Sequence, residues 1–394
     1  MIERSYWLDW LRVLAMGMLF LFHSSRPFAP PSWHIMNSTT ELGFTLFDSF
    51  ISGWIMPLFF VISGIAVNYS LAKRSAVQFV KDRFLRLMIP FLSVGLLIIL
   101  SVNVYYDAVF HGNFKGDFLS FYLGPYFTKF FPFDLNLSPT YFASSNQGIY
   151  LWYLFWLFAF SFATVHFFKW LAKAENRMKL SRLDSICNQR GGMLLLAIPL
   201  IIVNIAAVPP FFVFPSGYGG WKLPAYLTLF ITAYVMASNP RFEEAIEKNR
   251  LPTLLLGIVT SLLILAVTAV TTVESTANGS GSAISAYYVV ESTVWALNGW
   301  CWVMAILGFG RKHFSFNHRF LKVSNELVLP FYVLHQSVIV AVAYYVVGLN
   351  LITIEKYLLI VLASFPIIVA LLYPISKVNM LRFLFGMRIK NRSS

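Results

Sequence analysis

The chain contains ten predominantly apolar runs of the kind that cross a bilayer as helices. A hydrocarbon core roughly 30 Å thick takes about 17 to 25 helical residues to span. Charged residues make up only 12% of the 394 residues, whereas soluble proteins average about 25%. We therefore predict an all-α, polytopic integral membrane bundle of about ten helices, near residues 8–25, 50–70, 87–106, 148–169, 192–212, 223–237, 252–273, 284–307, 328–348 and 353–375.

The Lys and Arg residues alternate between the loops of this bundle. Cytoplasmic loops are enriched in Lys and Arg whatever their acidic residues do. Of the 30 basic residues, 24 lie in the two terminal segments and in every second loop, and Arg12 lies inside the first run. The pattern predicts an even number of spans with both termini in the cytoplasm. The opposite loops hold only five basic residues, namely Arg26, Lys115, Lys129, Lys222 and Lys356.

Membrane topology also explains the formal net charge of +13. A nucleic-acid-binding protein gathers its basic residues on one domain with a recognisable motif, whereas here they are spread over six cytoplasmic segments. We therefore expect the lipid bilayer, and no nucleic acid, as a partner. The sequence has no His-x4-Asp box, Gly-x-Ser-x-Gly elbow, P-loop or metal-ligand motif, and Cys187 and Cys301 make no disulfide framework. We expect no bound metal.

The sequence predicts one transmembrane domain, residues 1–380, and a short basic cytoplasmic tail, residues 381–394. The first run follows Arg4 as in a signal sequence, but no small-x-small cleavage site follows it, so we expect it to remain. The longest outer loop, about 107–147, is rich in Phe and Tyr. Such density is typical of interfacial anchoring or a re-entrant segment. A platform for sugar rings or lipid tails is the functional alternative.

Two ionisable side chains, Arg12 and His23, lie in the first run. An Arg inside a span costs about 2.5 to 3.5 kcal/mol on insertion scales, so it needs a partner or a role. Eleven helical residues are three turns plus about 20°, so both residues share one face, roughly 16 Å apart along the axis. We expect Arg12 toward the cytoplasmic end and His23 toward the outer end. Snorkelling of Arg12 to the headgroups and a merely packed His23 are the structural alternatives.

Arg83 and Arg86 precede the third run and lie three residues apart. On an α-helix they share a face and could hold a phosphate through bidentate hydrogen bonds. Basic residues at a cytoplasmic helix end are more often a topology signal that contacts lipid headgroups, and this alternative stays open.

Polar residues also interrupt two later runs, Glu291 in the eighth and His335 in the ninth. A carboxylate in a membrane usually pairs with Arg or His or stays protonated. We expect either residue to be a buried member of a polar network, with Glu291 coupled to His23, Arg12 or His335.

Five short motifs occur in a fixed order along the chain. They are Arg12-x10-His23, Phe59-Phe60-Val61-Ile62-Ser63-Gly64, Arg83-x-x-Arg86, Leu151-Trp152-Tyr153-Leu154 and Pro330-Phe331-Tyr332-Val333-Leu334-His335-Gln336. Each is weak alone, but together they resemble acyltransferase family 3, integral membrane enzymes that acylate extracytoplasmic sugars and other acceptors from cytoplasmic acyl-CoA. Trp33-His34, Met56-Pro57 and Glu291 are most similar to the glucan biosynthesis protein C branch, which is associated with succinylation of periplasmic glucans.

The resemblance implies an acyl-CoA-dependent O-acyltransferase of the cell (inner) membrane. The donor, succinyl-CoA or acetyl-CoA, is a co-substrate, and no cofactor is bound permanently. The acceptor is a hydroxyl of an extracytoplasmic glucan or other glycan, and a glycan synthase or exporter is a candidate partner. In this scheme Arg83 and Arg86 hold CoA phosphates and His23 is the general base.

Further roles follow from the same resemblance. Arg12 orients the donor or offsets its charge, and Glu291 orients His23 or contacts the acceptor. We expect His335, Trp152 and Ser63 to contact substrate or to belong to the polar network. Ser63, with Gly64 and Asn68 on the same helix, fits close helix packing at least as well.

Three alternatives remain at this stage. The first is acetyl transfer to a surface polysaccharide, lipid-linked sugar or small molecule. The second is a brief acyl-His intermediate. The third is a membrane transporter or exporter without acyl chemistry, because membrane-embedded Arg, His and Glu also line substrate and proton paths.

Overall fold

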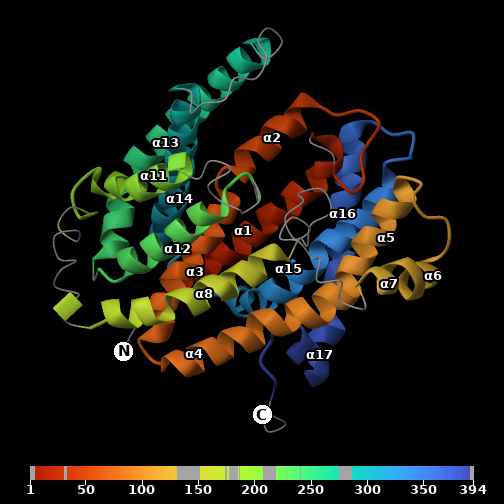
Figure 1. Ribbon diagram of the computed structural model, residues 1–394, viewed down its shortest axis with the longest axis horizontal. Helices are drawn as coiled ribbons and strands as arrows, with labels where there is room; N and C mark the ends of the chain where they lie inside the picture. Colours follow the sequence, from red (N-terminus) through yellow and green to blue (C-terminus); the bar gives the residue numbers. More distant parts are fainter. Residues whose placement is uncertain are drawn as a thin grey trace. The chain divides into compact units, whose positions relative to one another are not determined.

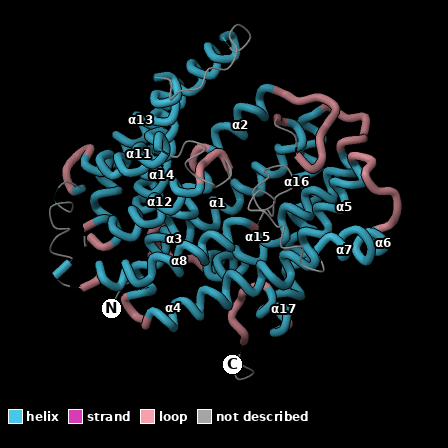
Figure 2. The backbone as a smooth tube through the Cα atoms, in the orientation of Figure 1, coloured by secondary structure: helices cyan, strands magenta, loops and turns pink. Residues whose placement is uncertain are grey.

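The chain is seen in a computed structural model that describes residues 5–30, 33–130, 151–173, 175–176, 185, 187–206, 219–239, 241–274 and 286–390. Most of these residues are helical and none forms a β-strand, which confirms the all-α prediction (Figure 2). The chain divides into two compact units, each described here by itself. Unit 1 comprises Met1–Arg12, Ser52–Ala76 and Ala163–Asn317, and unit 2 comprises Val13–Ile51, Val77–Phe162 and His318–Ser394.

Each of the ten predicted runs falls on a helical segment as far as the described residues extend (Figure 1). Three runs belong to segments of several pieces. The helices α2 and α3 follow each other closely, α4 leads to α5 through two π-helical stretches, η2 (Phe84–Met88) and η3 (Phe91–Ile99), and η5 continues into α11. The segments are α1 (Tyr6–Ser25), α2 (Leu42–Ser52), α3 (Ile55–Leu71), α4 (Ala76–Arg83), α5 (Leu100–Phe110), α8 (Trp152–Leu171), η5 (Gly192–Ala197), α11 (Ile198–Ala206), α12 (Leu223–Ala237), α13 (Phe242–Glu274), α14 (Ala286–His313), α15 (Arg319–Val346) and α16 (Thr353–Lys377).

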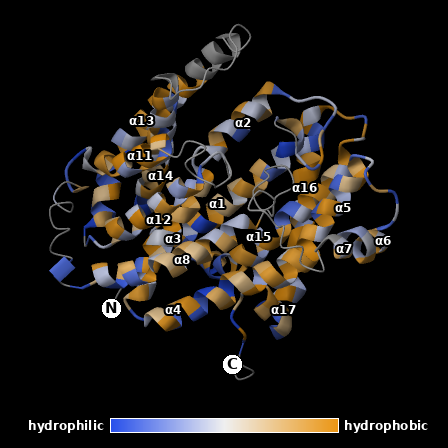
Figure 3. Ribbon diagram, in the orientation of Figure 1, coloured by the Kyte–Doolittle hydropathy of each residue, from blue (hydrophilic) through white to orange (hydrophobic). Residues whose placement is uncertain are grey.

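Seven of the described segments are long and apolar enough to cross a membrane. Gly192–Ala206 and Leu223–Ala237 are apolar but shorter, and α1 is not among the seven. Apolar residues predominate along α16 (Figure 3). Long helices such as α13 and α16 expose large apolar side chains, for example Leu255 (64%) and Leu362 (69%), as a helix facing lipid tails does. The chain is therefore a membrane protein, while the number of spans and the side of the termini remain predictions.

In unit 1, α3 and α12 approach each other closely at Gly64. A Cβ atom there would collide with the carbonyl oxygen of Phe230 and lie 2.8 Å from Cβ of Ala233. One turn later, Asn68 Nδ2 donates a hydrogen bond of 2.8 Å to Ser238 Oγ. Gly64 and Asn68 thus serve helix packing, the structural alternative named for them, and such small-residue contacts are typical of membrane helices.

The helices α13 and α14 also pack side by side in unit 1 (Figure 1). A Cβ at Gly308 would lie 2.5 Å from the carbonyl oxygen of Ile246, so glycine permits the approach. Asn298 Nδ2 donates to Thr260 Oγ1 at 3.0 Å and to Ser261 Oγ at 2.8 Å. A small residue and an interhelical amide therefore hold this pair together.

In unit 2, aromatic side chains join the second half of α1 to α15 and α16. The ring of Phe20 meets Phe331 edge-on at 5.8 Å and Phe365 at 6.1 Å between centroids. Ser337 Oγ donates to the carbonyl oxygen of Ile99 at 3.0 Å, which also ties α15 to η3. These contacts position the end of α1 against the middle of α15.

The predicted tail begins within a short helix, α17 (Asn379–Leu384), and the described part of it is packed on unit 2. Arg382 is only 2% exposed, and its guanidinium donates to the carbonyl oxygens of Arg388 (2.7 Å) and Ser376 (3.0 Å) and pairs with Glu326. Gly386 has a φ of +71°, and a Cβ there would collide with the carbonyl oxygen of Arg86. The domain boundary at 380 stays a prediction.

Candidate functional site

Two histidines from distant parts of the chain meet in unit 2. His23, near the end of α1, places Nδ1 at 2.8 Å from Nε2 of His335, which lies in the middle of α15. His335 is fully buried, as the sequence predicts, while His23 is half-buried. The two residues are 312 positions apart in sequence, and the packing of α1 on α15 brings them together.

The hydrogen bonds fix which nitrogens carry protons in the neutral rings. Nδ1 of His335 lies 2.7 Å from the carbonyl oxygen of Tyr332, which can only accept, so this nitrogen must donate. Nε2 of His335 is then the acceptor, and Nδ1 of His23 donates to it. Nε2 of His23 therefore carries the basic lone pair, and no described residue forms a hydrogen bond to it.

A third histidine lies beside this pair, and the sequence did not predict it as a site residue. His34 Nδ1 is 3.3 Å from Oδ1 of Asp107 on α5, and its Nε2 is 3.4 Å from Nε2 of Gln336. Gln336 directly follows His335, so neighbouring residues of α15 contact His23 and His34. The sequence indicated Trp33-His34 only through the family resemblance. The position of Asp107 in the sequence gave no indication that its carboxylate contacts a histidine.

Aromatic rings surround the two histidines. The rings of His23 and Trp33 are parallel within 7°, with centroids 6.4 Å apart, and those of His335 and Phe331 within 13° at 6.2 Å. From α8, Tyr153 contacts α15, with its ring 5.9 Å from that of Tyr332. Trp152 is half-buried, and its role remains a prediction.

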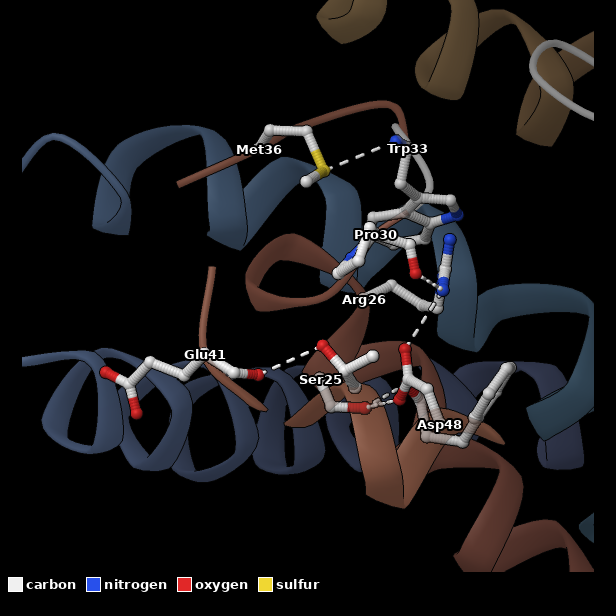
Figure 4. Close-up of polar contacts among 9 residues, drawn as sticks. Ser25, Arg26, Pro30, Trp33, Met36, Glu41 and Asp48 are labelled. Atoms are coloured by element: carbon white, nitrogen blue, oxygen red, sulfur yellow. Dashed lines mark hydrogen bonds and ion pairs between the residues drawn. The ribbon is translucent and has the colours of Figure 1, made fainter. Parts of the chain in front are cut away.

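An ion pair anchors the chain just after His23 (Figure 4). Arg26 Nη1 lies 3.0 Å from Oδ2 of Asp48 on α2, and Ser25 Oγ donates to Oδ1 of the same carboxylate at 2.5 Å. Asp48 is 4% exposed and the side chain of Arg26 13%, so the pair is largely shielded from solvent. The cluster fixes the end of α1, and therefore His23, relative to α2.

Arg12 lies on the same continuous helix as His23, although it belongs to unit 1 and His23 to unit 2. Its Nη1 forms a 2.9 Å ion pair with Asp9, one turn earlier on α1, and its side chain is 28% exposed. Asp9 was not predicted, although the i, i+3 spacing signals such a pair. The proposed contact of Arg12 with a donor remains a prediction.

Glu291 departs from its predicted environment. It lies on α14 in unit 1 and is exposed, so the expectation that it is buried in a polar network is wrong. No described residue forms a hydrogen bond or ion pair with it. Hydropathy placed this residue in an apolar run but could not say which face of the helix packs inward. Its role toward His23 or an acceptor remains untested. Ser63, by contrast, is buried in α3.

Arg83 and Arg86 do not lie on a regular α-helix. Arg83 ends α4, while Arg86 lies in the π-helix η2. A π-helix has more residues per turn than an α-helix, so residues three apart fall further short of a full turn and share a face less well. The expected shared face is therefore not formed in that way. Arg83 is half-buried with its guanidinium carbon 5.2 Å from the centroid of the Phe79 ring, and Arg86 is exposed. Phosphate binding by the pair remains a prediction.

The first part of the aromatic outer loop is ordered by its own rings. The ring of Phe121 lies 5.2 Å from that of Phe114 and 5.5 Å from that of Tyr105 on α5, and Tyr126 donates to the carbonyl oxygen of Leu96. Residues 131–147 of the predicted loop lie outside the described residues. Among the residues that are described, no group of His, Cys, Asp or Glu is arranged to hold a metal ion.

The fold and site define a helical membrane protein in which two histidines from distant helices are joined by a hydrogen bond. Residues 5–375 match the family described as an acyltransferase domain, so the chain belongs to acyltransferase family 3 and is a membrane acyltransferase. This confirms the resemblance inferred from the motifs.

Curated relatives match over a shorter region. The chain is 33% identical over 91 residues to glucans biosynthesis protein C of Escherichia coli (strain K12), and 34% identical over 90 residues to the protein of that name from Salmonella heidelberg (strain SL476). The match covers 23% of this chain and 24% and 23% of these relatives, less than a quarter of their length. No solved structure matches the chain.

Proposed function

We propose that the protein is a membrane O-acyltransferase that moves an acyl group, succinyl in the first instance, from cytoplasmic acyl-CoA to a hydroxyl of an extracytoplasmic glycan. Family membership supports acyl transfer, and the name of the curated relatives supports a glucan as the acceptor. The single observation that carries the mechanism is the hydrogen bond from Nδ1 of His23 to His335, which leaves the basic lone pair on Nε2, an atom to which no described residue forms a hydrogen bond.

In the proposed reaction, His23 acts as the general base. Its Nε2 takes the proton of the acceptor hydroxyl while the hydroxyl oxygen forms a bond to the thioester carbonyl carbon. The carbon–sulfur bond then breaks, the proton passes to the departing thiolate, and an ester and free CoA result. His335 accepts from Nδ1 throughout, so it holds the ring in one orientation while positive charge develops on it.

On the donor side, Arg83 and Arg86 are proposed to bind CoA phosphates. Arg86 is exposed on η2, and guanidinium groups hold phosphate oxygens through paired, charge-assisted hydrogen bonds. The segment that carries them rests against Gly386 through the backbone of Arg86, so it has a fixed conformation. Arg12, with one donor committed to Asp9, keeps further donors for a carbonyl or phosphate oxygen.

Binding of the acyl donor is the first test, because its measurement requires no knowledge of the acceptor. The unfolding temperature of the purified protein in lipid nanodiscs is measured against CoA, acetyl-CoA and succinyl-CoA. A ligand at 100 times its Kd adds about 2.7 kcal/mol of apparent stability. We expect saturable stabilisation, weakened in Arg83→Ala/Arg86→Ala. A folded protein that responds to no CoA species would contradict acyl transfer and favour the transporter.

The base assignment has its own test. Release of free thiol from acyl-CoA in the presence of a glucan should fall about 10²- to 10⁴-fold in His23→Ala, while CoA still stabilises the variant. Near-normal turnover in His23→Ala would exclude His23 as the base. The preferred acyl-CoA decides between succinyl and acetyl transfer. An acyl group trapped on His23 by rapid acid quench would identify the acyl-His route.

A further inference from the structure

A cavity of about 650 Å³ lies in unit 2, apart from the histidines. One wall is the loop before α2, with Asn37, Thr39 and Glu41. The other is the turn between α15 and α16, with Gly348, together with Lys356 near the start of α16. The distribution of basic residues predicts that this turn is extracytoplasmic, on the side of the acceptor. All residues that line the cavity are among those described.

Lys356 carries a buried charge next to this cavity. The residue is 6% exposed, and its Nζ donates to Oδ1 of Asn37 at 2.9 Å and to the carbonyl oxygen of Val347 at 2.7 Å. An ammonium group has three N–H donors, and the described residues provide no third acceptor and no carboxylate within ion-pair distance. Since buried charges require full hydrogen bonding, the third donor suits an oxygen atom of a ligand.

The remaining lining groups indicate the kind of ligand. The hydroxyls of Ser38 and Thr39, the exposed carboxylate of Glu41 and the backbone of the turn supply acceptors and donors around the ammonium group. One Lys and one Glu give no net charge. A phosphate or carboxylate would meet Glu41, whereas adjacent sugar hydroxyls both donate and accept, so the lining fits a neutral polyhydroxy ligand.

The cavity and the histidine site are built on the same two segments. On the loop, His34 contacts Gln336 and Asn37 follows three residues later. On α15, Gln336 and Val347 are eleven residues apart, which corresponds to about 16 Å along the helix axis. A glycan of several sugar units is long enough to reach from one place to the other.

We propose that this cavity is a glycan subsite. It holds a neutral sugar unit of the acceptor several units away from the hydroxyl that is acylated, with Lys356 donating to a sugar oxygen and Glu41 accepting from a hydroxyl. The proposal rests on the proposed function, because it assigns the cavity to the same acceptor.

The test fills the cavity without straining the fold. Gly348 lines the cavity, and a Cβ there meets open space, so Gly348→Phe blocks the cavity at no cost to the backbone. Gly43 on α2 is equally open but lies outside the lining, which makes Gly43→Phe the matched control. Glu41→Gln removes the carboxylate from an exposed position and keeps the shape of the side chain.

Binding of a β-linked glucose hexasaccharide to the protein in nanodiscs is measured by calorimetry. We expect Gly348→Phe to raise the Kd at least 10-fold, Glu41→Gln to raise it less, and Gly43→Phe to leave it unchanged. Failure of the wild type to bind the hexasaccharide, or equal binding by Gly348→Phe, would overturn the subsite. Displacement of the hexasaccharide by inorganic phosphate or succinate would also overturn it in favour of an anion site.

A kinetic measurement separates this subsite from the proposed function. With succinyl-CoA, Gly348→Phe should raise KM for the hexasaccharide and leave kcat with methyl glucoside, a single sugar unit, unchanged. An unchanged KM for the hexasaccharide would overturn the subsite while acyl transfer stands. Absence of thiol release from every acyl-CoA would overturn the proposed function, and the calorimetric result would still decide whether the cavity binds sugar.

Discussion

His335 holds the imidazole of His23 through the 2.8 Å hydrogen bond between its Nε2 and Nδ1 of His23. The carbonyl oxygen of Tyr332 fixes the other nitrogen of His335, so α15 determines the direction in which the pair is protonated. The residue proposed to react with the acceptor is therefore oriented from a different helix.

Replacement of His335 should reduce kcat for acyl transfer and leave the binding of CoA unchanged. In His335→Leu, His23 loses its acceptor and can adopt the other tautomer, so we expect kcat to fall at least about 10-fold with an unchanged Kd for CoA. His335→Gln places a carbonyl oxygen near the position of Nε2 and should retain more activity. Thiol release and CoA-dependent stabilisation measure the two effects. Wild-type kcat in His335→Leu would refute the positioning role.

Loss of Asp48 should destabilise the protein because it removes the carboxylate that neutralises the charge of the largely buried Arg26. Removing one partner of a buried ion pair costs about 3 to 5 kcal/mol. We expect Asp48→Ala to lower the unfolding temperature strongly, and Asp48→Asn, which can still accept from Ser25, to lower it less. If the two variants unfold at the wild-type temperature, the pair does not anchor the end of α1.

Gly64→Ala tests the close approach of α3 and α12 in unit 1. The new methyl group collides with Phe230, and overpacking of this kind costs about 1 to 3 kcal/mol. The control is Gly17→Ala on α1, where a Cβ meets open space and alanine favours the helix. Thermal unfolding of both variants gives the comparison. Equal stability of Gly64→Ala and wild type would contradict the packing described here.

Gly386→Ala should weaken donor binding through the backbone of Arg86. The substitution adds a collision with the Arg86 carbonyl oxygen to the strain of a φ of +71°. Gly112→Ala meets the same strain, with a φ of +72°, but faces open space, and so serves as the control. We expect a raised Kd for CoA in Gly386→Ala alone. Equal Kd values for CoA in the two variants would show that the C-terminal segment does not affect the proposed donor site.

Much of the fold could be predicted from sequence because the thickness of the bilayer determines how many apolar residues a spanning helix needs. All ten predicted runs lie on helical segments within the described residues. The π-helical stretches η2 and η3 could not be predicted, since no residue type requires them. The expectation that Arg83 and Arg86 lie on one regular α-helix was wrong for this reason.

The site was predicted in its parts but not in its connections. His23 and His335 were identified because ionisable side chains are costly in an apolar run, yet nothing in the sequence states that residues 312 positions apart share a hydrogen bond. His34 and Asp107 were missed because they belong to a loop and a helix end, where polar residues are ordinary. Glu291 was misjudged because hydropathy does not distinguish the lipid-facing side of a helix from its packed side.

The contact between Gly386 and Arg86 can form only late in the synthesis of the chain. The two residues are 300 positions apart in the chain, and a Cβ at Gly386 would collide with the backbone of Arg86. The earlier helices can enter the membrane while the ribosome is still translating. The segment proposed to bind acyl-CoA makes this contact only after residue 386 has been synthesised. We therefore expect incomplete chains in the membrane to bind acyl-CoA less tightly than the full chain.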